Sequence, residues 1–175
     1  MVHQIVKNAL IALKSAKSLA DWSLSHSSTE KYQLYLTKQG EIEANLESTR
    51  DDVDVTIYTK SKENLGESSF SLTTSNKSEI MSAIRDAKLL ATHVKQEPFE
   101  LAKPDPRADP HVALADETLL RARTDGNVDA ILQEAVSSIV EEFKKYKGVR
   151  LSSMELHASF TTNELRTSKR INASC

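Results

Sequence analysis

The period of the apolar residues is the feature that most constrains the fold, because it changes from that of a helix to that of a strand and back. Near the N-terminus, apolar residues recur at alternating steps of four and three. They are Val2, Val6, Ala9, Leu13, Ala16 and Ala20. This spacing predicts a helix over residues 4–23, which the polar residues 25–29 are expected to end.

From residue 32 onward the period is two. Apolar and polar residues alternate over four stretches, residues 32–36, 42–46, 53–58 and 65–74. Polar turns are predicted between them, at residues 38–40, 49–52 and 61–64. Four strands joined by short turns are typical of an antiparallel meander with one buried face and one face in water.

A second helix is predicted after the meander. Asn76 is a typical N-cap residue, and Glu79 follows it at the capping-box position. Apolar residues then keep helical spacing from Ile80 to Val94. A helix, a four-stranded antiparallel meander and a second helix predict an α+β fold in which both helices cover one face of the sheet.

The four prolines all lie between residues 98 and 110, which predicts an extended linker. We therefore expect a helix and sheet domain at residues 1–97, a proline-rich linker at 98–115 and a second α+β domain that starts within 116–175. In this last part, Asp116 is expected to cap a short helix, and a longer helix is expected to stop at Gly148.

The last patterned stretch, residues 149–171, predicts a terminal strand pair that turns at residues 161–163. Unpaired strands expose backbone hydrogen-bonding groups and tend to associate with other chains. We therefore expect sequence beyond Cys175 to supply the neighbours of this pair, so that the second domain is truncated.

The net charge of −2 gives no reason to expect nucleic-acid binding, which needs a basic surface. Residues from 144 onward nevertheless contain seven basic side chains and two acidic ones. This basic C-terminal region is either a helix end and a solvated strand face, or a surface for an acidic partner or an RNA. The first interpretation is favoured.

The single cysteine, Cys175, excludes an internal disulfide and a zinc site built from several cysteines. No apolar run is long enough to span a bilayer, and the N-terminus does not resemble a signal peptide. A cytoplasmic protein without membrane contact is therefore expected.

No residue pattern predicts a catalytic, cofactor-binding or metal site. None of the five histidines has the spacing of a helical zinc motif. His93 is interpreted as structural, and His111 beside Asp109 is the one histidine with a ligand-like neighbour. The crowded carboxylates are either an acid–base group or, as we favour, solubilising side chains. They are Glu41, Glu43, Glu47, Asp51, Asp52 and Asp54. The four glycines form neither a phosphate loop nor a nucleophile elbow.

The order of several short segments resembles a known family. An N-terminal helix precedes the segments Glu41-Ile42-Glu43-Ala44-Asn45 and Val53-Asp54-Val55-Thr56-Ile57-Tyr58. Gly66 and a strand rich in serine and threonine follow. The last two segments are the helix Ile80-Met81-Ser82-Ala83-Ile84-Arg85-Asp86-Ala87 and the loop Pro98-Phe99-Glu100-Leu101. This order resembles the first domain of the TldD/PmbA family, whose members are called modulators of DNA gyrase and are zinc metallopeptidases. Residues 165–174 resemble a hairpin of the family's second domain.

The resemblance implies that this chain is the N-terminal part of such a peptidase, inactive alone. The family's zinc motif, H-E-x-x-x-H, belongs to the C-terminal domain, and no residue here matches it. In the family, the N-terminal half helps to enclose a cleft, shared by two subunits, in which unfolded peptide is cleaved. An extended peptide substrate and a homo- or heterodimer partner are therefore expected, the peptide being held by strand addition to a sheet edge.

The alternative is a free-standing α+β module that binds a protein or peptide through a sheet edge or the basic C-terminal region. A hydrolase with its own active site comes third, because no nucleophile and base can be named. Amide exchange over residues 149–171 distinguishes the first two hypotheses, since strong protection indicates a complete domain.

Overall fold

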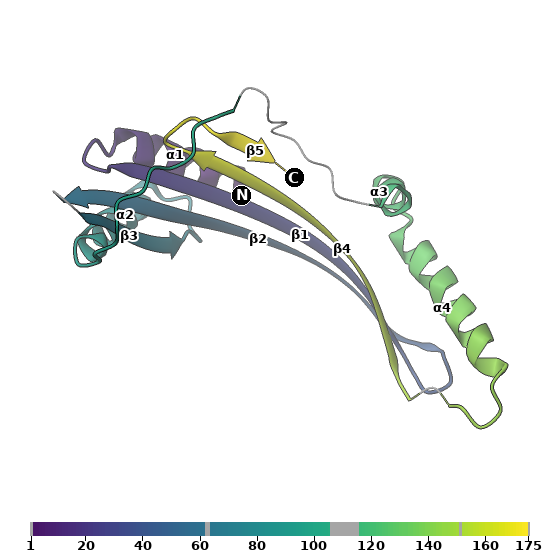
Figure 1. Ribbon diagram of the computed structural model, residues 1–175. Helices are drawn as coiled ribbons and strands as arrows, with labels where there is room; N and C mark the ends of the chain where they lie inside the picture. Colours follow the sequence, from purple (N-terminus) through teal and green to yellow (C-terminus); the bar gives the residue numbers. More distant parts are fainter. Residues whose placement is uncertain (1, 62–63, 106–115, 151, 175) are drawn as a thin grey trace. The chain divides into compact units, whose positions relative to one another are not determined.

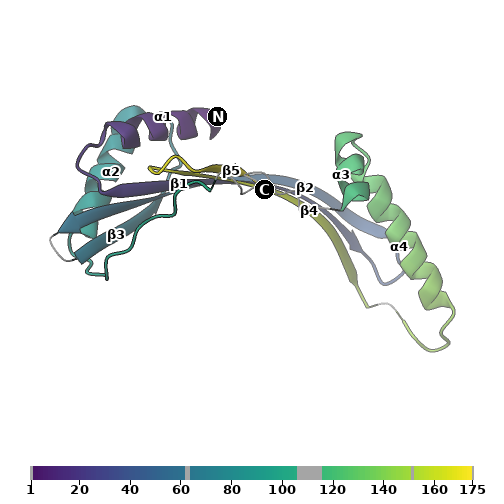
Figure 2. The same cartoon turned by 45° about the horizontal axis from the view of Figure 1, so that its top comes forward.

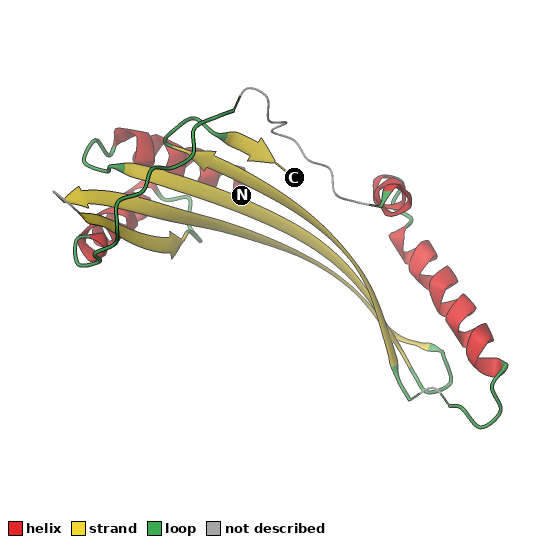
Figure 3. Cartoon of the chain, in the orientation of Figure 1, coloured by secondary structure: helices red, strands yellow, loops and turns green. Residues whose placement is uncertain are grey.

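The computed structural model describes residues 2–61, 64–105, 116–150 and 152–174. These residues form helices, strands and connecting loops (Figures 1 and 3). In chain order the elements are α1 (Val2–Ser15), β1 (Asp21–Leu36), β2 (Ile42–Ser61), β3 (Asn64–Ser71), α2 (Lys77–Ala91), α3 (Glu117–Thr124), α4 (Val128–Lys144), β4 (Met154–Thr167) and β5 (Asn172–Ser174). No helix among these residues is long and apolar enough to cross a membrane.

The strands form one five-stranded sheet in the order β3-β2-β1-β4-β5. β1, β2 and β3 are neighbours in sequence and in the sheet, and β2 pairs antiparallel with β3. After the helices α2, α3 and α4, β4 lies on the other side of β1 and pairs antiparallel with β5. The predicted α+β class is confirmed, with its order of helix, antiparallel strands, helices and terminal strand pair.

The chain forms two compact units, and each of the long strands β1, β2 and β4 contributes to both. The first unit draws on residues 1–28, 51–112 and 162–175, and the second on residues 29–50 and 113–161. The division into domains at 1–97 and 116–175 stays a prediction, and residues 106–115 of its linker lie outside the described residues.

In the first unit, α1 and α2 cover one face of the sheet, as predicted (Figure 2). Both helices and the strands enclose one apolar core. Its buried residues are Ile5, Val6, Ala9, Ala12, Leu13, Trp22, Leu24, Val53, Val55, Ile57, Leu72, Ile80, Ile84 and Ala87. Asn8 of α1 is also buried, and its Nδ2 donates to the carbonyl oxygen of Ser75 at 2.7 Å. This bond ties α1 to the segment that precedes α2.

The first helix is shorter than its apolar spacing predicts. α1 ends at Ser15 and β1 begins at Asp21, so the predicted helix to residue 23 and the polar break at residues 25–29 are wrong. Trp22 and Leu24 are buried at a period of two. A strand satisfies this period, because alternate side chains point to the same face.

Helix α2 begins as predicted. Asn76 accepts a hydrogen bond of 2.9 Å from the backbone N–H of Ser78, and its side-chain amide donates to Glu79 at 3.1 Å. At the other end of α2, the carbonyl oxygen of Ala91 lies against Gly66 of β3. A Cβ added at Gly66 would lie 1.8 Å from that oxygen, so the contact between α2 and β3 requires a glycine.

In the second unit, α3 and α4 pack on β1 and β4. The buried residues of this core are Leu34, Leu36, Ala122, Val128, Leu132, Val136, Ala158 and Phe160. Asp116 caps α3 as predicted, because its Oδ1 accepts hydrogen bonds from the backbone N–H groups of Thr118 and Leu119 at 2.8 and 3.0 Å. Arg123 of α3 donates two hydrogen bonds of 2.7 Å to the carboxylate of Glu30 on β1.

Two of the predicted turns lie inside strands. Residues 49–52 belong to β2, so the stretches 42–46 and 53–58 form one strand of 20 residues, and the meander has three strands instead of four. Residues 161–163 lie inside β4, and the chain turns later, where Arg170 has a φ of 68°. Neither segment contains glycine or proline, so an extended strand is not disfavoured there.

The apolar side of β2 in the second unit faces away from the helices. The side-chain amide of Asn45 donates to Asp129 of α4 at 3.0 Å, so the Asn45 side of β2 is turned toward α4. Side chains alternate along a strand, and Ile42 and Leu46 therefore lie on the opposite face, 47% and 50% exposed. The expected buried face of this segment is not part of the core.

Candidate functional site

The described histidines do not belong to any group of three metal-binding side chains. Among the described residues, no three histidine, cysteine or carboxylate side chains are placed to hold a metal ion. His26 is buried, and its Nε2 lies 3.3 Å from Oδ1 of Asp51. His93 follows the end of α2. His111 and its neighbour Asp109 lie outside the described residues.

Two carboxylates are held in the ionised form by fixed partners. Hydrogen bonds from Ser28 and His26 keep the pKa of Asp51 below its usual range. The two hydrogen bonds from Arg123 lower the pKa of Glu30 in the same way. A carboxyl group with a lowered pKa is a weak base and does not donate a proton at neutral pH. Neither carboxyl group therefore has the raised pKa that favours a general acid at neutral pH.

The other crowded carboxylates have separate environments. Glu41, Glu43 and Glu47 are exposed along the β1–β2 turn and the start of β2. Asp54 accepts a hydrogen bond of 2.5 Å from the hydroxyl of Ser71, on the neighbouring strand β3. The interpretation of the crowded carboxylates as solubilising side chains stays a prediction.

The basic C-terminal region is divided between the two units. Lys144, at the end of α4 in the second unit, pairs with Glu141 at 2.6 Å. Lys169, in the first unit, contacts Asp21 at 3.1 Å. The region is therefore two surfaces, each with some of its charge already paired.

One of these surfaces is a groove in the first unit, between α1 and the strands β4 and β5, which we call the α1 groove. It consists of two adjoining hollows of about 610 and 360 Å³ that share Leu10, Lys14 and Arg166. The basic side chains that line it are Lys7, Lys14, Arg166 and Arg170. Among the described residues that line it, only Glu164 is acidic, and it lies 3.3 Å from Arg166.

One edge of β4 lacks a neighbouring strand among the described residues. β5 pairs only with the end of β4, from Glu164 opposite Ser174 to Arg166 opposite Asn172. Residues 155–161 of β4 therefore border β1 on one side and no described strand on the other. We call this stretch the β4 edge, and it belongs to the second unit.

Two hydrogen bonds show which backbone groups the β4 edge presents. The backbone N–H of Ser168 donates to the carbonyl oxygen of Trp22, on β1, at 2.9 Å. The backbone N–H of Thr167 donates in the other direction, to the carbonyl oxygen of Ile171 on the β5 side, at 3.1 Å. Adjacent residues of a strand point their backbone groups to opposite sides. Even-numbered residues of β4 therefore bond β1, and odd-numbered residues face the open side. The hydroxyls of Thr29 and Thr161, 3.1 Å apart, show that this register continues into the second unit.

The outward backbone groups of the β4 edge are thus those of Glu155, His157, Ser159 and Thr161. Their side chains are all exposed, while the intervening Ala158 and Phe160 belong to the core under α3 and α4. The edge has the geometry that β-strand addition needs: a row of N–H and C=O groups on a strand whose other side is fixed.

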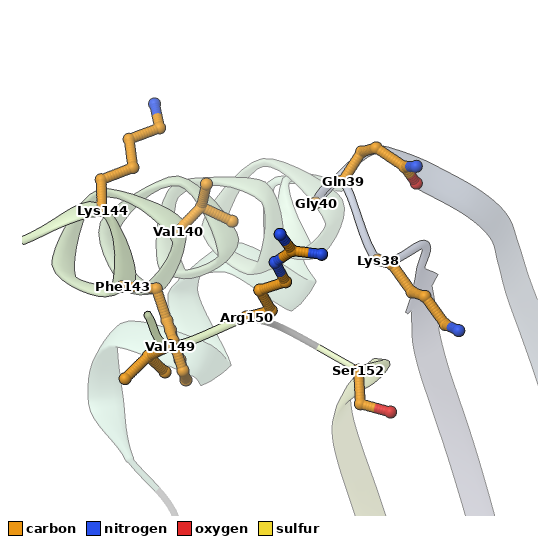
Figure 4. Close-up of a pocket in the computed structure, with 9 residues that line it drawn as sticks. All are labelled: Lys38, Gln39, Gly40, Val140, Phe143, Lys144, Val149, Arg150 and Ser152. Atoms are coloured by element: carbon orange, nitrogen blue, oxygen red, sulfur yellow. The ribbon is translucent and has the colours of Figure 1, made fainter. Parts of the chain in front are cut away.

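A pocket of about 640 Å³ lies at the tip of the second unit (Figure 4). It is formed by the β1–β2 turn, the end of α4 and the segment that precedes β4, and we call it the tip pocket. Its lining includes the cations Lys38, Lys144 and Arg150 and the apolar residues Val140, Phe143 and Val149. None of the described residues that line it is acidic.

The turn in the tip pocket is pressed against α4. Gly40 has a φ of 80°, and a Cβ added there would lie 2.9 Å from a methyl group of Val140. Figure 4 shows the guanidinium of Arg150 turned toward Val140 and Gly40. The sequence patterns did not identify this pocket, because the β1–β2 turn is far along the chain from the end of α4 and the segment before β4. None of these segments has a motif of its own.

Comparison with known proteins gives matches at the level of structure. No family model and no curated protein sequence matches the chain. TldE from Thermococcus kodakarensis is similar with a TM-score of 0.63 and 15% identity, over 98% of this chain and 36% of that protein. A proposed modulator of a DNA gyrase from Thermotoga maritima is similar with a TM-score of 0.57 and 14% identity, over 100% of this chain and 37% of that protein.

A third solved structure, a proposed modulator of DNA gyrase from Bacteroides thetaiotaomicron, has a TM-score of 0.53 and 15% identity, over 97% of this chain and 38% of that protein. Identities this low establish the fold alone. The chain spans little more than a third of the length of each of these proteins. Over that length it has the fold of TldE and of the two proposed DNA gyrase modulators, as its resemblance to the TldD/PmbA family predicted.

Proposed function

We propose that this chain is the substrate-enclosing and dimer-building portion of a TldD/PmbA-like zinc metallopeptidase that acts on unfolded peptides. The observation that supports this most is the similarity to TldE, which extends over 98% of the chain. The zinc motif of the family is not in this sequence, and the described residues offer no metal cluster. We therefore assign the described residues a role in substrate binding.

The β4 edge supports the substrate class. An extended peptide that pairs with Glu155, His157, Ser159 and Thr161 would be held through its backbone, with little dependence on its side chains. Each net hydrogen bond contributes about 0.5–1.5 kcal/mol. Unfolded segments of many sequences have this extended backbone in common, whereas folded proteins have already paired theirs. The edge therefore favours unfolded over folded substrates.

The test measures binding of a fluorescent, unstructured peptide of alternating threonine and valine by anisotropy. The control peptide has the same sequence but is N-methylated at every second residue, which removes its hydrogen-bond donors on one side. We expect the first peptide to bind and the second to bind at least about tenfold more weakly. Equal binding of both peptides would show that the backbone is not what is recognised.

Proline variants locate the binding site on the chain. His157→Pro and Ser159→Pro remove outward N–H groups without removing a bond to β1, so the fold should tolerate them as an edge strand tolerates proline. Together they should weaken peptide binding by about 1–3 kcal/mol. His157→Ala and Ser159→Ala are the matched controls and should bind as the unmodified chain does. Loss of binding in the alanine variants would assign recognition to the side chains.

The α1 groove favours a second function, a free-standing module that binds an acidic protein segment. Lys7, Lys14, Arg166 and Arg170 line it with one acidic residue among the described ones. A Glu-rich peptide should then bind in low salt and lose its affinity when Lys14→Glu is introduced. If the Glu-rich peptide does not bind while the threonine–valine peptide does, the first function stands alone.

A further inference from the structure

We infer that the tip pocket binds the C-terminal carboxylate of a peptide held along the β4 edge, so that the chain selects peptides by their free C-terminal ends. This inference rests on the proposed function of the β4 edge. It adds a fixed direction of the bound peptide and recognition of its C-terminus. Strand addition alone provides neither, because backbone pairing is the same at every position of a long peptide.

The direction of the peptide follows from the direction of β4. The strand runs from Met154 to Thr167, and the pairs that are observed in this sheet are antiparallel. Antiparallel pairing is slightly more stable per residue than parallel pairing. A peptide added antiparallel to the β4 edge runs from the Thr161 end to the Met154 end. Its C-terminus is therefore the end that arrives beside Met154.

The tip pocket lies at that same end of the strand. Ser152, which lines the pocket, comes two residues before Met154, and Arg150 precedes it by two more. The β4 edge and the pocket both belong to the second unit. A peptide of about the length of the edge therefore ends close to the pocket, and a shorter peptide can slide until its end reaches it.

The charge of the pocket matches a carboxylate. Lys38, Lys144 and Arg150 line it without an acidic residue among the described ones. Lys144 is already paired with Glu141 at 2.6 Å, and Figure 4 shows the Lys38 side chain extending away from Arg150. We therefore assign the carboxylate to Arg150. A guanidinium presents two parallel N–H donors to the two oxygens of a carboxylate.

The apolar part of the pocket matches the last side chain of the peptide. Phe143 and Val149 are 37% and 52% exposed, although both are large and apolar. They lie next to Val140 in the same lining. A leucine or phenylalanine at the peptide's C-terminus would cover them, whereas an acidic or lysine side chain would not. The ligand is thus an extended peptide with a free carboxylate and an apolar last residue.

The experiment compares peptides that differ only at the C-terminus. The fluorescent threonine–valine peptide is made with a final leucine as the free acid, with a final leucine as the amide, and with a final aspartate as the free acid. The leucine acid should bind about tenfold more tightly than the other two. The advantage over the amide should shrink as salt is raised, because exposed charges are screened.

Arg150→Gln tests the assignment of the carboxylate. It should remove most of the difference between the acid and the amide, and weaken binding of the amide much less than binding of the acid. Lys145→Gln is the control, since Lys145 follows α4 directly and does not line the pocket. Both residues are on the surface, so circular dichroism should report an intact fold.

The outcomes separate the two proposals. If the acid and the amide bind equally well, the carboxylate site is refuted and strand addition at the β4 edge remains. If the acid binds more tightly than the amide but the difference survives in Arg150→Gln, the carboxylate binds elsewhere and the inference is wrong. If none of the three peptides binds, the proposed function fails, and the inference fails with it.

Discussion

Replacement of Gly66 by alanine tests how the first unit is packed. The added Cβ would lie 1.8 Å from the carbonyl oxygen of Ala91 and 2.8 Å from Oγ1 of Thr59. Real Cβ contacts are essentially never shorter than 3.0 Å, so the end of α2 and the strand β3 have to separate by more than an ångström. The obstacle is backbone at the end of a packed helix, which cannot rotate away as a side chain could.

We expect Gly66→Ala to lower the free energy of unfolding by about 3 kcal/mol, the upper end of the range for overpacked sites. Urea unfolding followed by the fluorescence of Trp22 measures this change, because Trp22 is the single tryptophan of the chain and is buried in the first unit. Ser68→Ala, on the same strand, is the control and should change stability by less than about 0.5 kcal/mol. A Gly66→Ala protein as stable as this control would refute the close contact between α2 and β3.

Three further outcomes follow from the contacts. The pKa values of Glu30 and Asp51 are lowered in the folded chain, so their contribution to stability is present above the unfolded pKa values of about 4. It is lost as the pH falls through the lower pKa values of the folded chain. Thermal unfolding between pH 6 and pH 2 should show this loss of stability, and Glu30→Gln should make the loss smaller. Leu34→Ala should cost about 2–5 kcal/mol, since this side chain is fully buried. Ile42→Ser combined with Leu46→Ser should lower the free energy of unfolding by much less. A loss as large as that of Leu34→Ala would show that both residues are buried.

Local signals predicted much of the fold. Asn76 and Asp116 cap helices as their side chains suggested, because capping depends on a few neighbouring backbone groups. The change of period also indicated the antiparallel strands correctly. The start of β1 was missed because Ala16 and Ala20 continue the helical spacing past Ser15, where α1 ends. The absence of glycine and proline from residues 47–54 was the signal that argued against a turn there.

The candidate site could be predicted only in outline. A sheet edge was expected to bind peptide, but which edge is open depends on β4 pairing with β1, a contact between segments far apart in the chain. The tip pocket depends in the same way on Gly40, Val140 and Arg150 being brought together. Sequence periodicity reports which face of an element is apolar, and it does not report which elements become neighbours.

Residue-specific amide exchange with and without the threonine–valine peptide tests the central claim most directly. The N–H groups of Glu155, His157, Ser159 and Thr161 face the open side of β4, whereas those of Leu156, Ala158 and Phe160 are directed to β1. We predict that the peptide slows exchange at the four odd-numbered positions and leaves the even-numbered ones nearly unchanged. Unchanged exchange at all of these positions, under conditions in which the peptide is bound, would contradict strand addition at the β4 edge.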